Sequence, residues 1–144
     1  MGLNSENRRD IVLYRIERAY KALEQAKGCL AMSYLEVTAN RLYYAAYYAV
    51  SALLVAYEIP THTHEGCIQQ FGMHFVQTGI FSKEKGRFFN NLFHMRLTGD
   101  YSDRFDLSIE DVQPKVIPTE EFVAEVVQLA KQKIGLPPRS FNNQ

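Results

Sequence analysis

An arginine, an aspartate and a tyrosine stand close together in the second half of the chain: Arg96, Asp100 and Tyr101. Arg96 continues a ridge that carries Phe89 and Phe93, so its guanidinium is expected at the edge of a core or in a cleft. A cation there needs a carboxylate or a phosphate to offset its desolvation. One interpretation is a structural Arg–Asp clamp. The other is an anion site for a phosphodiester or nucleotide, with Tyr101 as hydrogen-bond donor or stacking surface.

A second arginine, Arg41, begins a stripe that continues through Tyr44 and Tyr48. A guanidinium beside these rings indicates either a cation–π contact or a second arm of the same polar pocket. Ordinary packing is the remaining alternative for Arg41.

Histidines and cysteines are the other residues with metal-binding or nucleophilic chemistry. They are His62, His64, His74, His94, Cys29 and Cys67. No glutamate precedes a histidine at the Glu-x-x-His offset of bundle di-metal sites, and the zinc-protease spacing is also missing. The sequence therefore predicts no metal and no cofactor. The cysteines are interpreted as buried, reduced thiols, because nothing around them marks a catalytic nucleophile.

All elements that position these residues are predicted to be helices, because apolar residues recur at steps of three and four. The expected helices span 5–31, 34–57, 64–78, 83–97 and 119–134, the last one capped by Thr119 to Glu121. Residues 98–106 predict a turn, since Gly and Asp disfavour a continuing helix. A short helical turn within 107–118 is limited by Pro114 and Pro118. The fold class is an all-α bundle of four to five helices.

Length and charge set the broad class of protein. The 144 residues suit one domain with a core over about 8–134 and a mobile tail over 135–144. Sixteen basic and sixteen acidic residues cancel, so any attraction to nucleic acid must come from a local patch. The chain has no long apolar run and no secretory pattern near residue 1, so we expect a cytoplasmic protein without a membrane partner.

The helix expected at 34–57 is apolar on two faces. One stripe includes Tyr43 and Val50, and the other runs from Arg41 through Tyr44 and Tyr48. Such a helix needs neighbours on both sides. A subunit interface in a dimer is the preferred interpretation, and a central helix wrapped by its own chain is the alternative.

Four segments in order resemble the HEPN domain family, in its small stand-alone prokaryotic branch. They are Asn40–Ala49, His64–Gly66, Phe71–Val76, and Arg96 with Asp100 and Tyr101. The resemblance covers roughly residues 8–134. It implies an up-and-down bundle that forms a two-fold homodimer. It also implies a partner, a minimal nucleotidyltransferase, in a toxin–antitoxin-like pair.

Many members of that family are metal-independent endoribonucleases whose signature is an arginine followed, four to six residues later, by a histidine. Arg96 matches the arginine, whereas the positions for the histidine hold Tyr101, Ser102 and Asp103. His64, from another helix, is a hypothetical substitute. In some members a tyrosine just beyond the histidine receives adenylate groups from the partner, and Tyr101 stands near that place.

The leading hypothesis is a homodimeric module that binds a nucleotide or an RNA phosphate and works with a nucleotidyltransferase. In it Arg96 holds phosphate, Asp100 orients Arg96, Tyr101 stacks or donates, and Arg41 lines the cleft. The first alternative is an endoribonuclease toxin in which Arg96 stabilises the phosphorane-like transition state and His64 or Tyr101 replaces the missing histidine. The second is a non-catalytic helical scaffold. Whether the protein is an enzyme stays open at this point.

Overall fold

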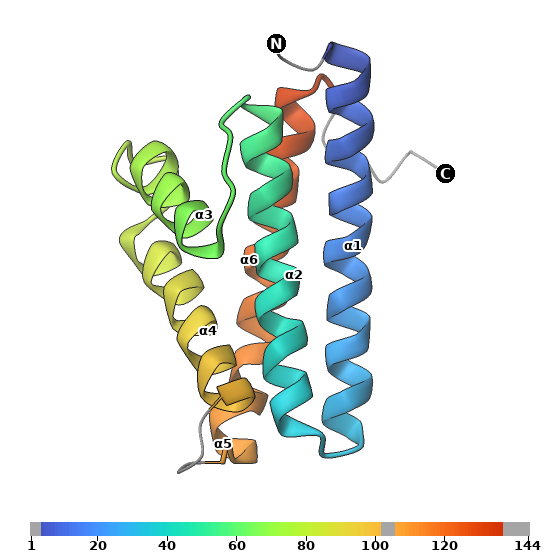
Figure 1. The fold of residues 1–144 in the computed structure, drawn as a ribbon, viewed down its shortest axis with the longest axis vertical. Helices are drawn as coiled ribbons and strands as arrows, with labels where there is room; N and C mark the ends of the chain where they lie inside the picture. Colours follow the sequence, from blue (N-terminus) through green and yellow to red (C-terminus); the bar gives the residue numbers. More distant parts are fainter. Residues whose placement is uncertain (1–3, 102–105, 137–144) are drawn as a thin grey trace.

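The computed structural model describes residues 4–101 and 106–136. Within those ranges every regular element is helical, which confirms the all-α class (Figure 1). The long helices are α1 (Ser5–Ala31), α2 (Leu35–Ala56), α4 (Lys83–Tyr101) and α6 (Val116–Lys133). The short ones are α3 (His64–Phe71), a π-helical turn (Gly72–Val76), α5 (Ile109–Val112) and a 3-10 turn (Gln113–Lys115).

Helix α2 lies at the centre of the bundle. It forms an antiparallel hairpin with α1, and it also contacts α3, α4, α5 and α6 (Figure 1). The other helices of the same chain therefore cover most of both apolar faces of α2. This arrangement agrees with the alternative prediction, a central helix wrapped by its own chain. The dimer stays a prediction.

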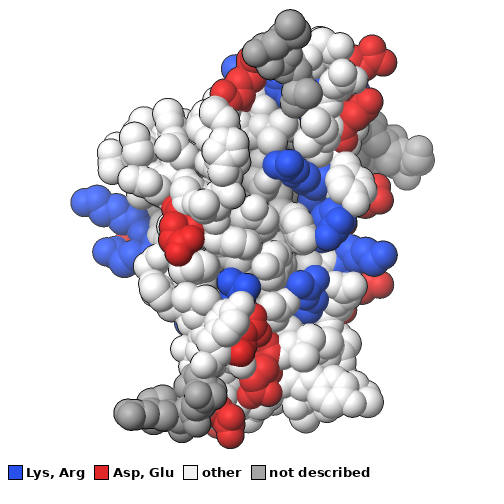
Figure 2. All heavy atoms as spheres, in the orientation of Figure 1, with Lys and Arg blue, Asp and Glu red and all other residues white. Residues whose placement is uncertain are grey.

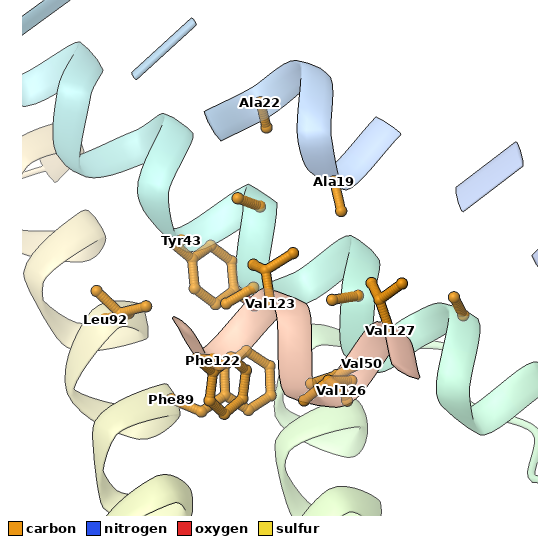
Figure 3. Close-up of a cluster of buried hydrophobic side chains, with 14 of the residues drawn as sticks. Ala19, Ala22, Tyr43, Val50, Phe89, Leu92, Phe122, Val123, Val126 and Val127 are labelled. Atoms are coloured by element: carbon orange, nitrogen blue, oxygen red, sulfur yellow. The ribbon is translucent and has the colours of Figure 1, made fainter. Parts of the chain in front are cut away.

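The core lies where α2, α4 and α6 meet. Tyr43, Phe89 and Phe122 are fully buried there, beside Val50 and valines of α6 (Figure 3). Helices α1 and α2, which make the most extensive helix–helix contact of the bundle, both bury several alanines. These alanines include Ala19, Ala22, Ala26, Ala45, Ala49 and Ala52. Small side chains at a contact let two helix axes approach closely, so α1 and α2 pack as a tight pair.

Helix α4 is longer than the sequence predicts, because it continues through Gly99 to Tyr101 instead of ending at residue 97. A Cβ atom on Gly99 would lie 3.0 Å from Leu107 Cδ1 and 3.4 Å from Glu36 Cα. The glycine therefore serves a close approach between α4 and α2 and does not make a turn. Packing here outweighs the low helix propensity of glycine. Ser102 and Asp103, in the rest of the predicted turn, lie outside the described residues.

Two other boundaries also differ from the prediction. Helix α6 begins at Val116, with Pro118 in its first turn, where a missing N–H costs no hydrogen bond. Thr119 does not cap this helix; it is fully buried and donates its hydroxyl proton to the Lys115 carbonyl at 2.7 Å. The predicted helix over 64–78 is α-helical only to Phe71 and then continues as the π-helical turn.

Part of the expected tail, residues 137–144, lies outside the described residues. Over the part of the chain that is described, no helix is both long and apolar enough to cross a membrane.

Candidate functional site

Arg96 lies on α4 and faces the tyrosines of α2. Its Nε donates to Asp100 Oδ2 at 3.0 Å, and its side chain is only 12% exposed. The guanidinium carbon is 5.8 Å from the ring centre of Tyr43, 5.5 Å from Tyr44 and 5.7 Å from Tyr101. The Arg–Asp clamp is therefore present. Within the described residues, no hydrogen bond is found for its two terminal nitrogens.

A hydrogen-bond network joins Arg96 to Arg41. Asn40 Nδ2 donates to the same Asp100 oxygen at 3.1 Å, and Arg41 donates from Nε and Nη2 to Asn40 Oδ1 at 3.0 and 2.7 Å. Gln25 Oε1 accepts from Arg41 Nη1 at 3.2 Å. Arg41 also lies over the Tyr44 ring, at 5.0 Å from its centre. Both arginines therefore contact the Tyr44 ring, and the network holds their positions.

His64 joins this cluster from a different part of the chain. It is the first residue of α3, and the preceding Thr63 caps that helix by accepting from the Gly66 N–H at 2.8 Å. The imidazole lies among four aromatic rings, with centroid distances of 4.4 Å to Tyr47, 5.5 Å to Tyr44, 5.6 Å to Tyr43 and 6.5 Å to Phe93. Two of these rings, those of Tyr43 and Tyr44, also contact Arg96.

A hydrogen bond of 2.7 Å between Tyr43 Oη and His64 Nδ1 holds the imidazole in place. Burial raises the pKa of Tyr43 well above its ordinary value, so this hydroxyl keeps its proton. In one tautomer Nδ1–H donates to the hydroxyl and Nε2 keeps a lone pair that can take a proton. In the other tautomer Tyr43 donates, and Nε2–H becomes a donor.

The environment of His64 favours the uncharged imidazole. Burial is the main cause of its lowered pKa, and the positive charge of Arg96 lowers the pKa further, while Glu65 opposes both. Because the ordinary value is about 6.5, His64 is neutral at pH 7. The cluster therefore pairs a permanent cation with a neutral proton acceptor.

The lowered pKa of His64 can be measured directly. We expect an NMR titration to place the pKa of His64 below about 6.5, and the Arg96→Gln variant to raise it. An unfolded chain then binds this proton more readily than the folded one, so His64 destabilises the fold increasingly as pH falls from about 6.5 toward its folded-state pKa. A pKa of His64 at or above about 6.5 would contradict the burial described here.

The structure brings together the candidate site residues that were predicted from the sequence. Arg96, Asp100, Arg41 and His64 form one connected cluster, and Tyr101 lies at its edge with its side chain 68% exposed. Sequence reasoning did not assign roles to Asn40, Tyr43 and Tyr47, which form the network and the aromatic wall. These three residues could have been found in the sequence, because each directly precedes a residue of the stripe formed by Arg41, Tyr44 and Tyr48.

Of the remaining reactive side chains, Cys67 lies close to the aromatic wall, where it interacts electrostatically with Tyr43 and Tyr47. His62, His74 and His94 are exposed. Cys67 is fully buried, and burial raises the pKa of its thiol to about 12, which makes it a poor nucleophile; Cys29 is half-buried. Among the described residues, no three histidine, cysteine or acidic side chains are grouped so that they could hold a metal ion.

Comparison with known proteins agrees with this architecture. A model of the HEPN domain family matches residues 12–134. A UPF0332 protein of Thermotoga maritima is 37% identical over 119 residues, which cover 83% of this chain and 90% of that protein. Two proteins of Methanocaldococcus jannaschii named "Putative toxin" are 29% and 27% identical, over 68% and 92% of this chain and 67% and 96% of their own lengths.

The family match extends from the second turn of α1 to the end of α6 and therefore includes α2, α3 and α4, which carry the cluster. With this match and the Thermotoga relative, the chain belongs to the HEPN domain family.

Proposed function

We propose that this chain is a toxin-like HEPN protein that binds RNA phosphate at Arg96 and cleaves the RNA without a metal ion. The observation that carries the proposal is the position of His64, which shares the rings of Tyr43 and Tyr44 with Arg96. The names of the two Methanocaldococcus relatives support the toxin-like role. In this proposal His64 replaces the histidine that is missing after Arg96.

The proposed reaction uses the two groups in different ways. His64 takes the proton of the ribose 2′-hydroxyl, and the 2′ oxygen attacks phosphorus. The bond from phosphorus to the 5′ oxygen breaks, which leaves a 2′,3′-cyclic phosphate. The departing 5′ oxygen takes a proton from water, and the hydroxide then accepts the proton from the imidazolium. The terminal nitrogens of Arg96 stabilise the negative charge that grows on the phosphoryl oxygens.

The experiment that tests this proposal is an RNA cleavage assay in the presence of EDTA. Wild-type protein is expected to produce fragments that end in a 2′,3′-cyclic phosphate. Arg96→Ala should lower the rate by about 10²–10³-fold, because it removes the cation that faces the phosphate. The matched control is His94→Ala, an exposed site on the same helix, which should keep the wild-type rate.

Two other results would redirect the interpretation. If wild-type protein binds RNA or ATP and Arg96→Ala abolishes that binding, but no RNA is cleaved, the protein is the nucleotide- or RNA-binding module. If neither ligand binds and Arg96→Ala only lowers the melting temperature, the Arg96–Asp100 pair is a structural clamp in a scaffold protein.

Tyr101 favours a second, regulatory function in partnership with a minimal nucleotidyltransferase. Its side chain is 68% exposed and its ring lies 5.7 Å from the guanidinium carbon of Arg96. Transfer of an adenylate from ATP to the Tyr101 hydroxyl, with release of pyrophosphate, would place a phosphate beside Arg96 and block it. Incubation with ATP and the transferase should add one adenylate to the mass of the wild-type chain but not to that of Tyr101→Phe. An equal increase in the variant would reject Tyr101 as the acceptor.

A further inference from the structure

A polar groove lies between α1 and α2, beside the cluster around Arg96. Its volume is about 360 Å³, and it is lined by Tyr14, Glu17, Arg18, Lys21, Gln25, Arg41 and Tyr48. Figure 2 shows Lys and Arg side chains gathered over α1 and α2 on this face. Three of the lining residues are cations and one is an acid. The groove is thus a local basic patch on a chain whose total charge is zero.

Neutral groups, and not carboxylates, position Arg18 in the groove. Its two terminal nitrogens donate to Tyr14 Oη at 3.0 Å and Tyr48 Oη at 2.7 Å. Its guanidinium carbon lies 5.7 and 4.8 Å from the centres of the same two rings. These contacts orient the guanidinium without an ion pair among the described residues, although Glu17 lines the same groove. Arg96 differs, because Asp100 compensates part of its charge.

Arg41 connects this groove to the Arg96 cluster. Its partners are the amide oxygens of Gln25 and Asn40, which are also neutral. None of the ion pairs in the described residues involves Arg18, Lys21 or Arg41. Arg41 and Arg96 both contact the ring of Tyr44. A line of positive charge therefore runs from the groove to the proposed cleavage site.

We infer that the groove binds a second phosphate of the same RNA strand, next to the phosphate at Arg96. This inference rests on the proposed function. Arg41 in the groove and Arg96 at the proposed cleavage site contact the same ring, that of Tyr44. A polyanion can bind at both basic positions at once, whereas a single free phosphate cannot. Lys21 and Arg41 supply charge, and the 56% exposed Tyr14 offers a ring on which a base can stack. The ligand class is single-stranded RNA, bound through its backbone and without sequence preference.

Lys21→Gln is the variant that tests the groove, because Lys21 is exposed and no described residue forms an ion pair with it. The probe is a fluorescent 2′-O-methyl RNA of about eight nucleotides, which cannot be cleaved. We expect its Kd to rise about tenfold at low salt. The slope of log K against log salt should fall by about 0.7, the value for one lost phosphate contact on a single strand. Lys27→Gln, on the same helix but paired with Glu120, should bind like wild type.

Cleavage of a dinucleotide separates this inference from the proposed function. A dinucleotide has one phosphate and cannot occupy the groove and the cleavage site together. Wild type should therefore cleave it, and Arg96→Ala should cleave it about 10²–10³-fold more slowly, whether or not the groove binds phosphate. If Arg96→Ala loses cleavage but Lys21→Gln keeps the wild-type Kd and salt slope for the octamer, the groove inference is wrong and the proposed function stands. The groove inference is also wrong if AMP binds as tightly as the octamer, since the groove would then be a mononucleotide site. It is equally wrong if Lys21→Gln changes the oligomeric mass in light scattering, since the groove would then be a subunit contact.

Discussion

Replacing His64 with alanine is expected to lower the rate of RNA cleavage by about 10²–10⁴-fold, the usual loss when a general base is removed. The physical reason is that Arg96 cannot accept a proton, and His64 is the neutral imidazole that shares its aromatic wall. The measurement is single-turnover cleavage at saturating protein. RNA binding should change little, because Arg96 and the groove remain.

The controls for His64→Ala are His62→Ala and His94→Ala, both at exposed sites. Tyr43→Phe keeps the ring but removes the hydrogen bond to His64 Nδ1, so it should give a smaller loss of rate and a shifted pH profile. In wild type the rate should fall only when the pH drops below about 6.5, because burial and Arg96 lower the pKa of the base. A His64→Ala enzyme with the wild-type rate would remove His64 from the reaction and leave its role structural.

Replacing Phe122 with alanine should destabilise the protein by about 3–5 kcal/mol, the usual cost of removing a fully buried phenylalanine. Phe122 lies on α6, and its ring contacts Phe89 and Phe88 of α4 and Phe71 of α3 at centroid distances of 5.7, 5.8 and 5.7 Å. A cavity at this place loosens the two helices that carry His64 and Arg96. The measurement is urea unfolding at pH 7, followed by circular dichroism.

The matched control for Phe122→Ala is Ile117→Ala on the same helix. The Ile117 side chain is 66% exposed, so its replacement should change the unfolding free energy by no more than about 0.5 kcal/mol. A loss of less than about 1 kcal/mol in Phe122→Ala would show that α3 and α4 are held mainly by other contacts.

The helical pattern of the sequence predicts most of the fold, because periodic burial is a local property. Helix α1 was expected over 5–31 and is observed at Ser5–Ala31. The errors lie where packing between helices decides. Gly99 was interpreted as part of a turn, but it permits the close contact of α4 with Glu36 and Leu107. No local pattern around residue 99 contains that information, because Glu36 lies in α2 and Leu107 lies beyond the end of α4.

Within the candidate site, the Arg96–Asp100 pair could be predicted from the sequence, whereas the position of His64 could not. Arg96 and Asp100 are four residues apart, so a helix alone places them side by side, and their pairing followed from the sequence. His64 is separated from Arg96 by the rest of α3, a π-helical turn, a loop and most of α4. The family resemblance made it a hypothetical substitute, and only the fold brings its ring onto Tyr43 and Tyr44.

By itself the sequence determined the all-α class, most helix boundaries and the Arg96–Asp100 pair, because each depends on neighbours within about one turn along the chain. Only the tertiary structure decided that His64 lies beside Arg96 and that Arg18, Lys21 and Arg41 line one groove. Those arrangements depend on how α1, α3 and α4 pack against the tyrosines of α2. Side chains from separate helices meet through packing geometry, which no spacing in a single segment encodes.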